Sequence, residues 1–189
     1  MDRIEIDGAA VEAAEKIYLM MNKPRGLVTT ADDEKGRETV YSLLPKNLAW
    51  IAPVGRLDKA SEGLLLFTND SAWAARITDP ASHLDKTYHV QVDHPADTDL
   101  IRDLESGVEV GGGEPLRAKS VRILRSGSKT SWLEIVLDEG KNRQIRRMLE
   151  GRGVGVLRLM RVAIGGLRLG DLRKGGCRVL NAEDKSSLE

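Results

Sequence analysis

Apolar and polar positions along the chain follow strand-like patterns more often than helical ones. Residues 87–92 and 132–137 alternate with a period of two, as in a strand with one buried face. Residues 17–21 and 63–69 are dominated by apolar side chains and predict buried strands. Residues 27–30 predict a further short strand, and the span 154–169 shows strand-like alternation interrupted by glycines.

Helical patterns are confined to short segments. A helix is expected after Ser71, which we predict to be its cap, and another over 97–104, with Gly107 as its stop. The segment 141–151 also predicts a helix, and 39–44 a short one. Strands and helices do not alternate regularly, so we predict an α+β fold with a mixed, largely antiparallel sheet.

The polar ends of the chain suggest a simple division. We expect a polar N-terminal arm over residues 1–15, a single domain over 16–182 with a subdomain boundary near residue 80, and a polar, frayed tail over 183–189. The start of the chain lacks the pattern of a signal peptide, and no apolar run is long enough to cross a membrane. With one cysteine, Cys177, an internal disulfide is impossible. A cytoplasmic protein is therefore expected.

Charge is distributed unevenly over a chain whose formal net charge is zero. Residues 141–178 contain eleven Lys and Arg against two acidic residues, a local charge of +9. Residues 1–15 contain five acidic residues against one Arg, a local charge of −4. Such asymmetry favours a surface that binds a polyanion, although clustering by chance is the alternative.

Three short motifs contain candidate chemical groups. Asp58 lies in a polar loop between two apolar strands, in the segment 55–66. Rigid elements on both sides of such a loop can fix a catalytic carboxylate, but Asp is also common in ordinary turns. Tyr88 begins a strand in Lys86-Thr87-Tyr88. Its ring is suited to stacking on a base, or simply to packing in the core.

The third motif places three arginines on one face of the predicted helix over 141–151. Arg143, Arg146 and Arg147 are spaced by three and four residues, and therefore share one face. The apolar residues Ile145, Met148 and Leu149 form another. The arginines form either a solvated surface or a cluster that binds phosphate or a carboxylate.

Together with the segment 21–26, Met-Asn-Lys-Pro-Arg-Gly, these motifs resemble RNA pseudouridine synthases of the RsuA/RluB/RluE type. The order of the four segments agrees with the family, and the resemblance covers residues 17–180, nearly the whole chain. It implies an α+β fold of two subdomains flanking a catalytic cleft. It also implies isomerisation of uridine to pseudouridine in RNA without a cofactor or a metal.

The resemblance also implies roles for individual residues. Asp58 matches the family's catalytic Asp, Tyr88 the tyrosine that stacks on the uracil and transfers a proton, and Arg146 the basic residue that pairs with the Asp. A further set is expected near the RNA: Arg56, Lys86, Asn142, Arg143 and Arg147.

The N-terminus resembles the RluE-like branch, because about sixteen residues before the first strand are too few for the S4 domain of many relatives. That branch implies 23S ribosomal RNA as the partner in preference to 16S. The protein is expected to be a monomer. Two alternatives stay open: a ribosome-assembly protein that binds RNA without catalysis, and a synthase acting on 16S rRNA or tRNA.

Overall fold

The computed structural model describes residues 5–6, 9–10 and 15–188. The predicted arm over residues 1–15 therefore lies largely outside the described residues. Within it, β1 (Glu5–Ile6) and β2 (Ala9–Ala10) pair antiparallel.

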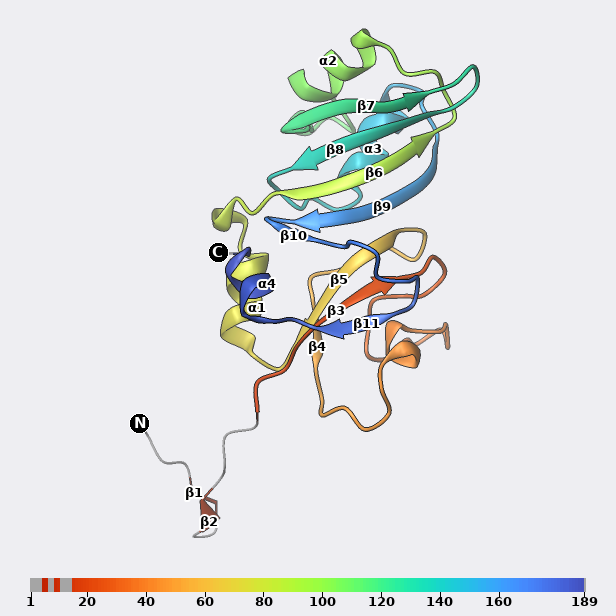
Figure 1. Cartoon of the computed structure of the whole chain (residues 1–189). Coiled ribbons are helices and arrows are strands. Elements are labelled where there is room, and N and C mark those ends of the chain that lie inside the picture. The colour runs from red at the N-terminus through yellow and green to blue at the C-terminus, as the bar shows by residue number, and fades with distance from the viewer. Residues whose placement is uncertain (1–4, 7–8, 11–14, 189) are drawn as a thin grey trace.

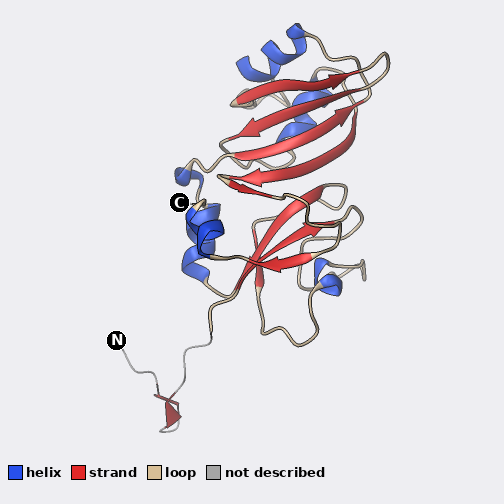
Figure 2. Ribbon diagram, in the orientation of Figure 1, coloured by secondary structure: helices blue, strands red, loops and turns tan. Residues whose placement is uncertain are grey.

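Within the described part of the chain, nine strands form one mixed sheet in the order β11-β3-β5-β9-β6-β8-β7, with β4 paired to β5 and β10 to β9 (Figures 1 and 2). The strands are β3 (Tyr18–Lys23), β4 (Ala52–Val54), β5 (Glu62–Thr68), β6 (Lys86–Val92), β7 (Ser120–Ser126), β8 (Ser131–Leu137), β9 (Val156–Ile164), β10 (Leu167–Arg168) and β11 (Cys177–Val179). The helices and 3₁₀ turns are η1 (Val40–Leu43), α1 (Ser71–Thr78), η2 (Pro80–Ser82), α2 (Thr98–Ser106), α3 (Gln144–Gly151) and α4 (Ala182–Ser186). The predicted α+β fold with a largely antiparallel sheet is confirmed.

The sheet has two halves that meet where β5 runs parallel to β9. Two residue pairs form this junction, Glu62 with Met160 and Gly63 with Arg161. Gly63 has a φ of +101°, and a Cβ atom there would lie 2.2 Å from the Arg161 carbonyl oxygen. Only glycine permits so close an approach. The junction therefore depends on the residue that begins the apolar run after the Asp58 loop.

One half contains β6, β7, β8 and β9 and is covered by helices on one face. Along β8 the burial alternates, with Leu133, Ile135 and Leu137 buried. These residues form a core cluster with α2 and α3, to which Leu104 and Met148 contribute. The period-two pattern over 132–137 thus reflects a strand with one face against helices, as predicted.

The other half contains β3, β4, β5 and β11 and is covered on both faces. All seven residues of β5 are buried. Leu64 and Leu66 pack toward α1 and the C-terminal segment, whereas Leu65 and Phe67 pack toward η1 and the loops around it. In Figure 1, α1 and α4 lie together beside this half. Burial on both faces explains why β5 has no polar alternation.

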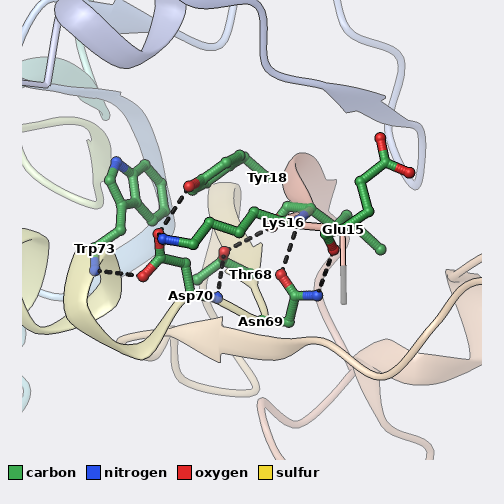
Figure 3. Close-up of polar contacts among 8 residues, drawn as sticks. Glu15, Lys16, Tyr18, Thr68, Asn69, Asp70 and Trp73 are labelled. Atoms are coloured by element: carbon green, nitrogen blue, oxygen red, sulfur yellow. Dashed lines mark hydrogen bonds and ion pairs between the residues drawn. The ribbon is translucent and has the colours of Figure 1, made fainter. Parts of the chain in front are cut away.

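A polar network ties the start of β3 to the beginning of α1 (Figure 3). The Asp70 carboxylate accepts hydrogen bonds from the Tyr18 hydroxyl at 2.8 Å, from Lys16 Nζ at 2.8 Å and from the Trp73 backbone N–H at 3.1 Å. Asp70, not Ser71, is therefore the helix cap. The prediction was wrong by one residue because both side chains are suited to capping.

Three other local expectations differ from the structure. Residues 27–30 form no strand beyond an isolated bridge from Val28 to Thr39, and the Thr29 hydroxyl donates to the Leu57 carbonyl at 2.7 Å. The helix expected from 141 begins at Gln144. The tail is not frayed over its described residues, since α4 has a capping box and Leu188 is 4% exposed.

Among the residues described, none of the helices combines the length and the apolar character needed to cross a bilayer.

Candidate active site

A cavity of about 540 Å³ opens beside the junction of β5, β6 and β9. Seven of the eight predicted site residues line it: Arg56, Asp58, Lys86, Tyr88, Asn142, Arg143 and Arg146. They come from the Asp58 loop, from β6 and from the turn into α3. Arg147, the eighth, is not part of the lining, because it lies one helix position past Arg146. The volume is within the range of ordinary ligand sites.

The segment 23–29 contacts the Asp58 loop and supports its backbone. Lys23 Nζ donates hydrogen bonds to the carbonyl oxygens of Asp58 at 3.1 Å and Ser61 at 2.9 Å, as well as to that of Pro24. The Gly26 N–H donates to the Lys59 carbonyl at 2.8 Å. These bonds fix the backbone on both sides of Asp58, so the carboxylate is held on a rigid turn.

Lys23 is fully buried, with 0% exposure. Burial lowers the pKa of its ammonium group from 10.5 to about 8, and the negative charges of Asp58 and Glu62 oppose that effect. The sequence analysis quoted Lys23 within the segment 21–26 but did not predict a site role. We identify it as a residue that positions the Asp58 loop, and its signal was a lysine at the end of an apolar strand.

Two arginines approach the Asp58 side chain, which is 38% exposed. Arg143 Nη1 lies 3.7 Å from Asp58 Oδ2. Arg146 forms no ion pair with Asp58 among the described residues. Its Nη2 donates instead to the Ala60 carbonyl oxygen at 3.2 Å, and its buried Nε has no partner there. The direct pairing expected for Arg146 is therefore replaced in this structure by a contact from Arg143.

The charge of Asp58 nevertheless affects the pKa of Arg146. Burial lowers the pKa of Arg146, the nearby charge of Arg143 lowers it further, and Asp58 acts in the opposite direction. Arg146 thus holds the backbone of the Asp58 loop and contributes positive charge beside it.

The turn into α3 has an unusual backbone that directs Arg143 toward the cavity. Arg143 has a φ of +49°, a left-handed conformation uncommon for a residue other than glycine. Gln144, only 2% exposed, secures this turn. Its side-chain amide donates to the Arg117 carbonyl at 3.0 Å and to Glu139 at 2.6 Å. Sequence analysis did not select Gln144, because its burial is not visible in a polar motif.

Tyr88, Lys86 and Arg161 line the β-sheet side of the cavity. Tyr88 pairs with Arg161 across the β6–β9 ladder, so the two side chains leave the sheet on the same face. Arg161 is 6% exposed, and its Nε donates to the Leu64 carbonyl oxygen at 2.8 Å. The sequence analysis counted Arg161 only within the basic segment, so its place in the cavity is a finding of the structure.

The basic segment 141–178 does not form a single unneutralised surface. Six of its eleven cations pair with acidic side chains: Lys141, Arg143, Arg152, Arg158, Lys174 and Arg178. Glu62, for example, accepts from Arg158 at 2.8 Å and Lys174 at 2.7 Å. The predicted +9 surface is therefore reduced, because these pairs offset part of its positive charge.

The site thus brings one carboxylate, one aromatic side chain and several cations into a cavity between two halves of a sheet. This combination is suited to an enzyme that acts on a nucleotide within a polyanion, with the ring available for stacking and the carboxylate for attack or charge stabilisation. Among the described residues, no three His, Cys, Asp or Glu side chains gather as a metal site. The absence of a cofactor stays a prediction.

Comparison with known proteins identifies the family. Residues 17–151 match the RNA pseudouridylate synthase family. The chain belongs to this family and is an RNA pseudouridine synthase. The predicted family is therefore confirmed.

Named relatives and a solved structure agree with this assignment. The chain is 37% identical to ribosomal large subunit pseudouridine synthase B of Bacillus subtilis over 99% of its own length and 77% of that protein. It is 40% identical to the protein of the same name from Salmonella typhimurium, over 98% and 66% of the two lengths. A crystal structure of a pseudouridylate synthase, 32% identical, superposes with a TM-score of 0.80 over 93% of this chain and 74% of that one.

Proposed function

We propose that this enzyme isomerises a specific uridine of large-subunit ribosomal RNA to pseudouridine, with Asp58 as its catalytic carboxylate. The observation that carries the assignment of Asp58 is its placement. It is a cavity-facing carboxylate fixed through its own loop by Lys23 and faced by Arg143. The preference for large-subunit RNA rests on the names of the two relatives.

The chemistry accounts for the composition of the site. Pseudouridine formation breaks the bond between N1 of uracil and C1′ of ribose, and joins C5 to C1′ with loss of the C5 proton. A carboxylate in the cavity assists the first step, by attack or by stabilising positive charge on the sugar. The target base must first leave its stack, which costs a few kcal/mol. Tyr88 is then the surface on which the extruded uracil stacks.

The cations around Asp58 fall into two groups in this proposal. Arg146 and Lys23 hold the loop backbone from within the protein. Arg56, Asn142 and Arg143 are exposed at the cavity, where they contact the phosphates of RNA. Arg147 contributes to RNA binding outside the cavity. The cytoplasmic location and the monomeric state belong to the same proposal.

The test is pseudouridine formation by the purified protein on protein-free 23S and 16S rRNA without an added cofactor. Wild type is compared with Asp58→Asn, which removes the charge and keeps the volume, and with Asp171→Asn as the matched control on an exposed loop. We expect one new pseudouridine in 23S rRNA from wild type and the control. Asp58→Asn should bind RNA but show no turnover.

Other outcomes would redirect the proposal in different ways. Modification of 16S rRNA alone would refute the substrate and keep the residue assignment. Near-normal turnover by Asp58→Asn would refute the residue assignment. Binding of either RNA by the wild type with no product, including on ribosome-assembly particles, would favour a role in assembly without catalysis.

A further inference from the structure

Arg161 lines the cavity and has a buried hydrogen-bond donor without a partner among the described residues. Its side chain is 6% exposed and its Nη2 is buried without a partner among the described residues, while Nε is bound to the Leu64 carbonyl. A buried guanidinium donor is costly to leave unpaired. Because Arg161 also lines the cavity, the missing acceptor is expected to arrive with the substrate.

Lys86 provides a second cation without an acidic partner at the same place. It also lines the cavity, and it forms no ion pair or side-chain hydrogen bond among the described residues. Burial lowers the pKa of Lys86, and the charge of Arg161 is the next largest cause. The two cations are therefore close enough to repel each other. They form a cationic corner, made of Lys86 and Arg161, in which neither side chain forms an ion pair among the described residues; Asp85 and Asp138 act on Lys86 through their charge alone.

The burial of Arg161 indicates whether the base or a phosphate of the RNA binds to the cationic corner. Arg56 and Arg143 are exposed, in positions suited to the backbone of RNA at the surface. Arg161 is buried, and it lies beside Tyr88 on the neighbouring strand. The base is the part of an extruded nucleotide that enters farthest. A carbonyl oxygen of uracil is thus the acceptor that can reach Arg161.

We propose that Arg161 and Lys86 bind a carbonyl oxygen of the target uracil and stabilise the negative charge that develops on it. The inference rests on the proposed function and extends it. When the N1–C1′ bond breaks, the electron pair remains on uracil and is delocalised from N1 to O2 and O4. Preorganised cations at one of these oxygens favour bond breaking more than ground-state binding. The charge is neutralised when C5 forms its bond to C1′; the C5 proton then leaves and N1 gains a proton, so that the product is an isomer of the substrate.

The experiment is a double-substitution cycle, in which one protein side chain and one substrate atom are changed separately and then together. The substrate is the rRNA fragment that wild type modifies, synthesised with uridine, 2-thiouridine or 4-thiouridine at the target position and tritium at C5. Release of tritium reports the joining of C5 to C1′. Wild type is compared with Arg161→Gln, Lys86→Met and, as the matched control, Lys141→Met, a cavity-lining cation paired with Glu139.

Sulfur is a weak hydrogen-bond acceptor, so one thio-substrate should slow wild type by about tenfold. On uridine, Arg161→Gln and Lys86→Met should lower kcat by about 10- to 100-fold. The same thio-substitution should slow these two variants no further, whereas Lys141→Met should retain the full thio effect. Lys86→Met leaves the Arg161 bond to Leu64 intact, and therefore separates base contact from damage to the junction.

The inference would be overturned if 2-thiouridine and 4-thiouridine each slowed both variants as much as they slow wild type. Variants whose defect lies in KM alone would also overturn it, because that would indicate ground-state binding of RNA. Failure of the proposed function is a different result, in which wild type releases no tritium from the unmodified fragment.

Discussion

Lys23, which holds the backbone of the Asp58 loop, permits a test of how far burial lowers the pKa of a lysine despite nearby carboxylates. The perturbation is Lys23→Met, which keeps the length of the side chain and removes its charge. With a pKa lowered from 10.5 to about 8, the folded protein releases the Lys23 proton earlier than the unfolded chain does. Between these two pH values the unfolded state binds more protons, so this group adds stability as pH rises.

The magnitude follows from the size of the pKa change. At 1.36 kcal/mol for each unit, the lowered pKa corresponds to about 3 kcal/mol. This cost is present in full below pH 8 and has disappeared above pH 10.5. The stability of wild type relative to Lys23→Met should therefore increase by about 3 kcal/mol between pH 7 and pH 10.5.

The assay is urea unfolding at several pH values from 7 to 10.5. Cys177, Tyr18 and Tyr41 have raised pKa values and lower the stability in the same range, but they are present in both proteins and cancel in the difference. Lys59→Met, on the exposed neighbour of Asp58, is the control and should show no such trend. A difference between wild type and Lys23→Met that does not change with pH would refute the reasoning, since the buried ammonium would then keep its ordinary pKa.

Three further predictions concern the sheet junction, the C-terminal segment and the single thiol. Gly63→Ala should cost at least about 2 kcal/mol of unfolding free energy in urea, because the new methyl group meets the Arg161 backbone at a positive φ; a loss under 0.5 kcal/mol would contradict this. Leu188→Ala should cost about 2–3 kcal/mol, whereas Glu183→Ala, at an exposed position, should change stability little; equal effects would mean that the tail does not pack. Partial burial raises the pKa of the Cys177 thiol, so iodoacetamide at pH 8 should alkylate it several-fold more slowly than in urea, as followed by mass spectrometry, and equal rates would be inconsistent with a half-buried thiol.

The sequence predicted the fold class and most of the candidate site because the relevant signals are local. The alternating burial of 132–137 and the apolar run of 63–69 follow directly from which faces are covered. Asp58 was assigned from the resemblance to the family, because its position between two apolar strands also fits an ordinary turn. Seven predicted residues share one cavity although they come from three separate segments of the chain, around residues 56–58, 86–88 and 142–146, each of which carries a motif of the family.

The remaining features depend on geometry that a linear pattern does not contain. Spacing places Arg143, Arg146 and Arg147 on one helical face, but Arg143 lies before the helix in a left-handed conformation and approaches Asp58. Lys23 and Arg161 are charged, and charge usually indicates exposure. Their burial depends on backbone carbonyls contributed by residues distant in sequence. The C-terminal helix was missed because its stability comes from a cap and one buried leucine within a polar stretch.

The pairing of β11 with β3 constrains when the protein becomes complete during synthesis. Cys177 pairs with Met21, and Val179 with Leu19, so an early strand waits for one made more than 150 residues later. The half of the sheet that supports the Asp58 loop keeps an open edge on β3 until then. Such long-range pairing slows folding. The half of the sheet that supports the Asp58 loop therefore gains its last strand only after residues 177–179 have been made.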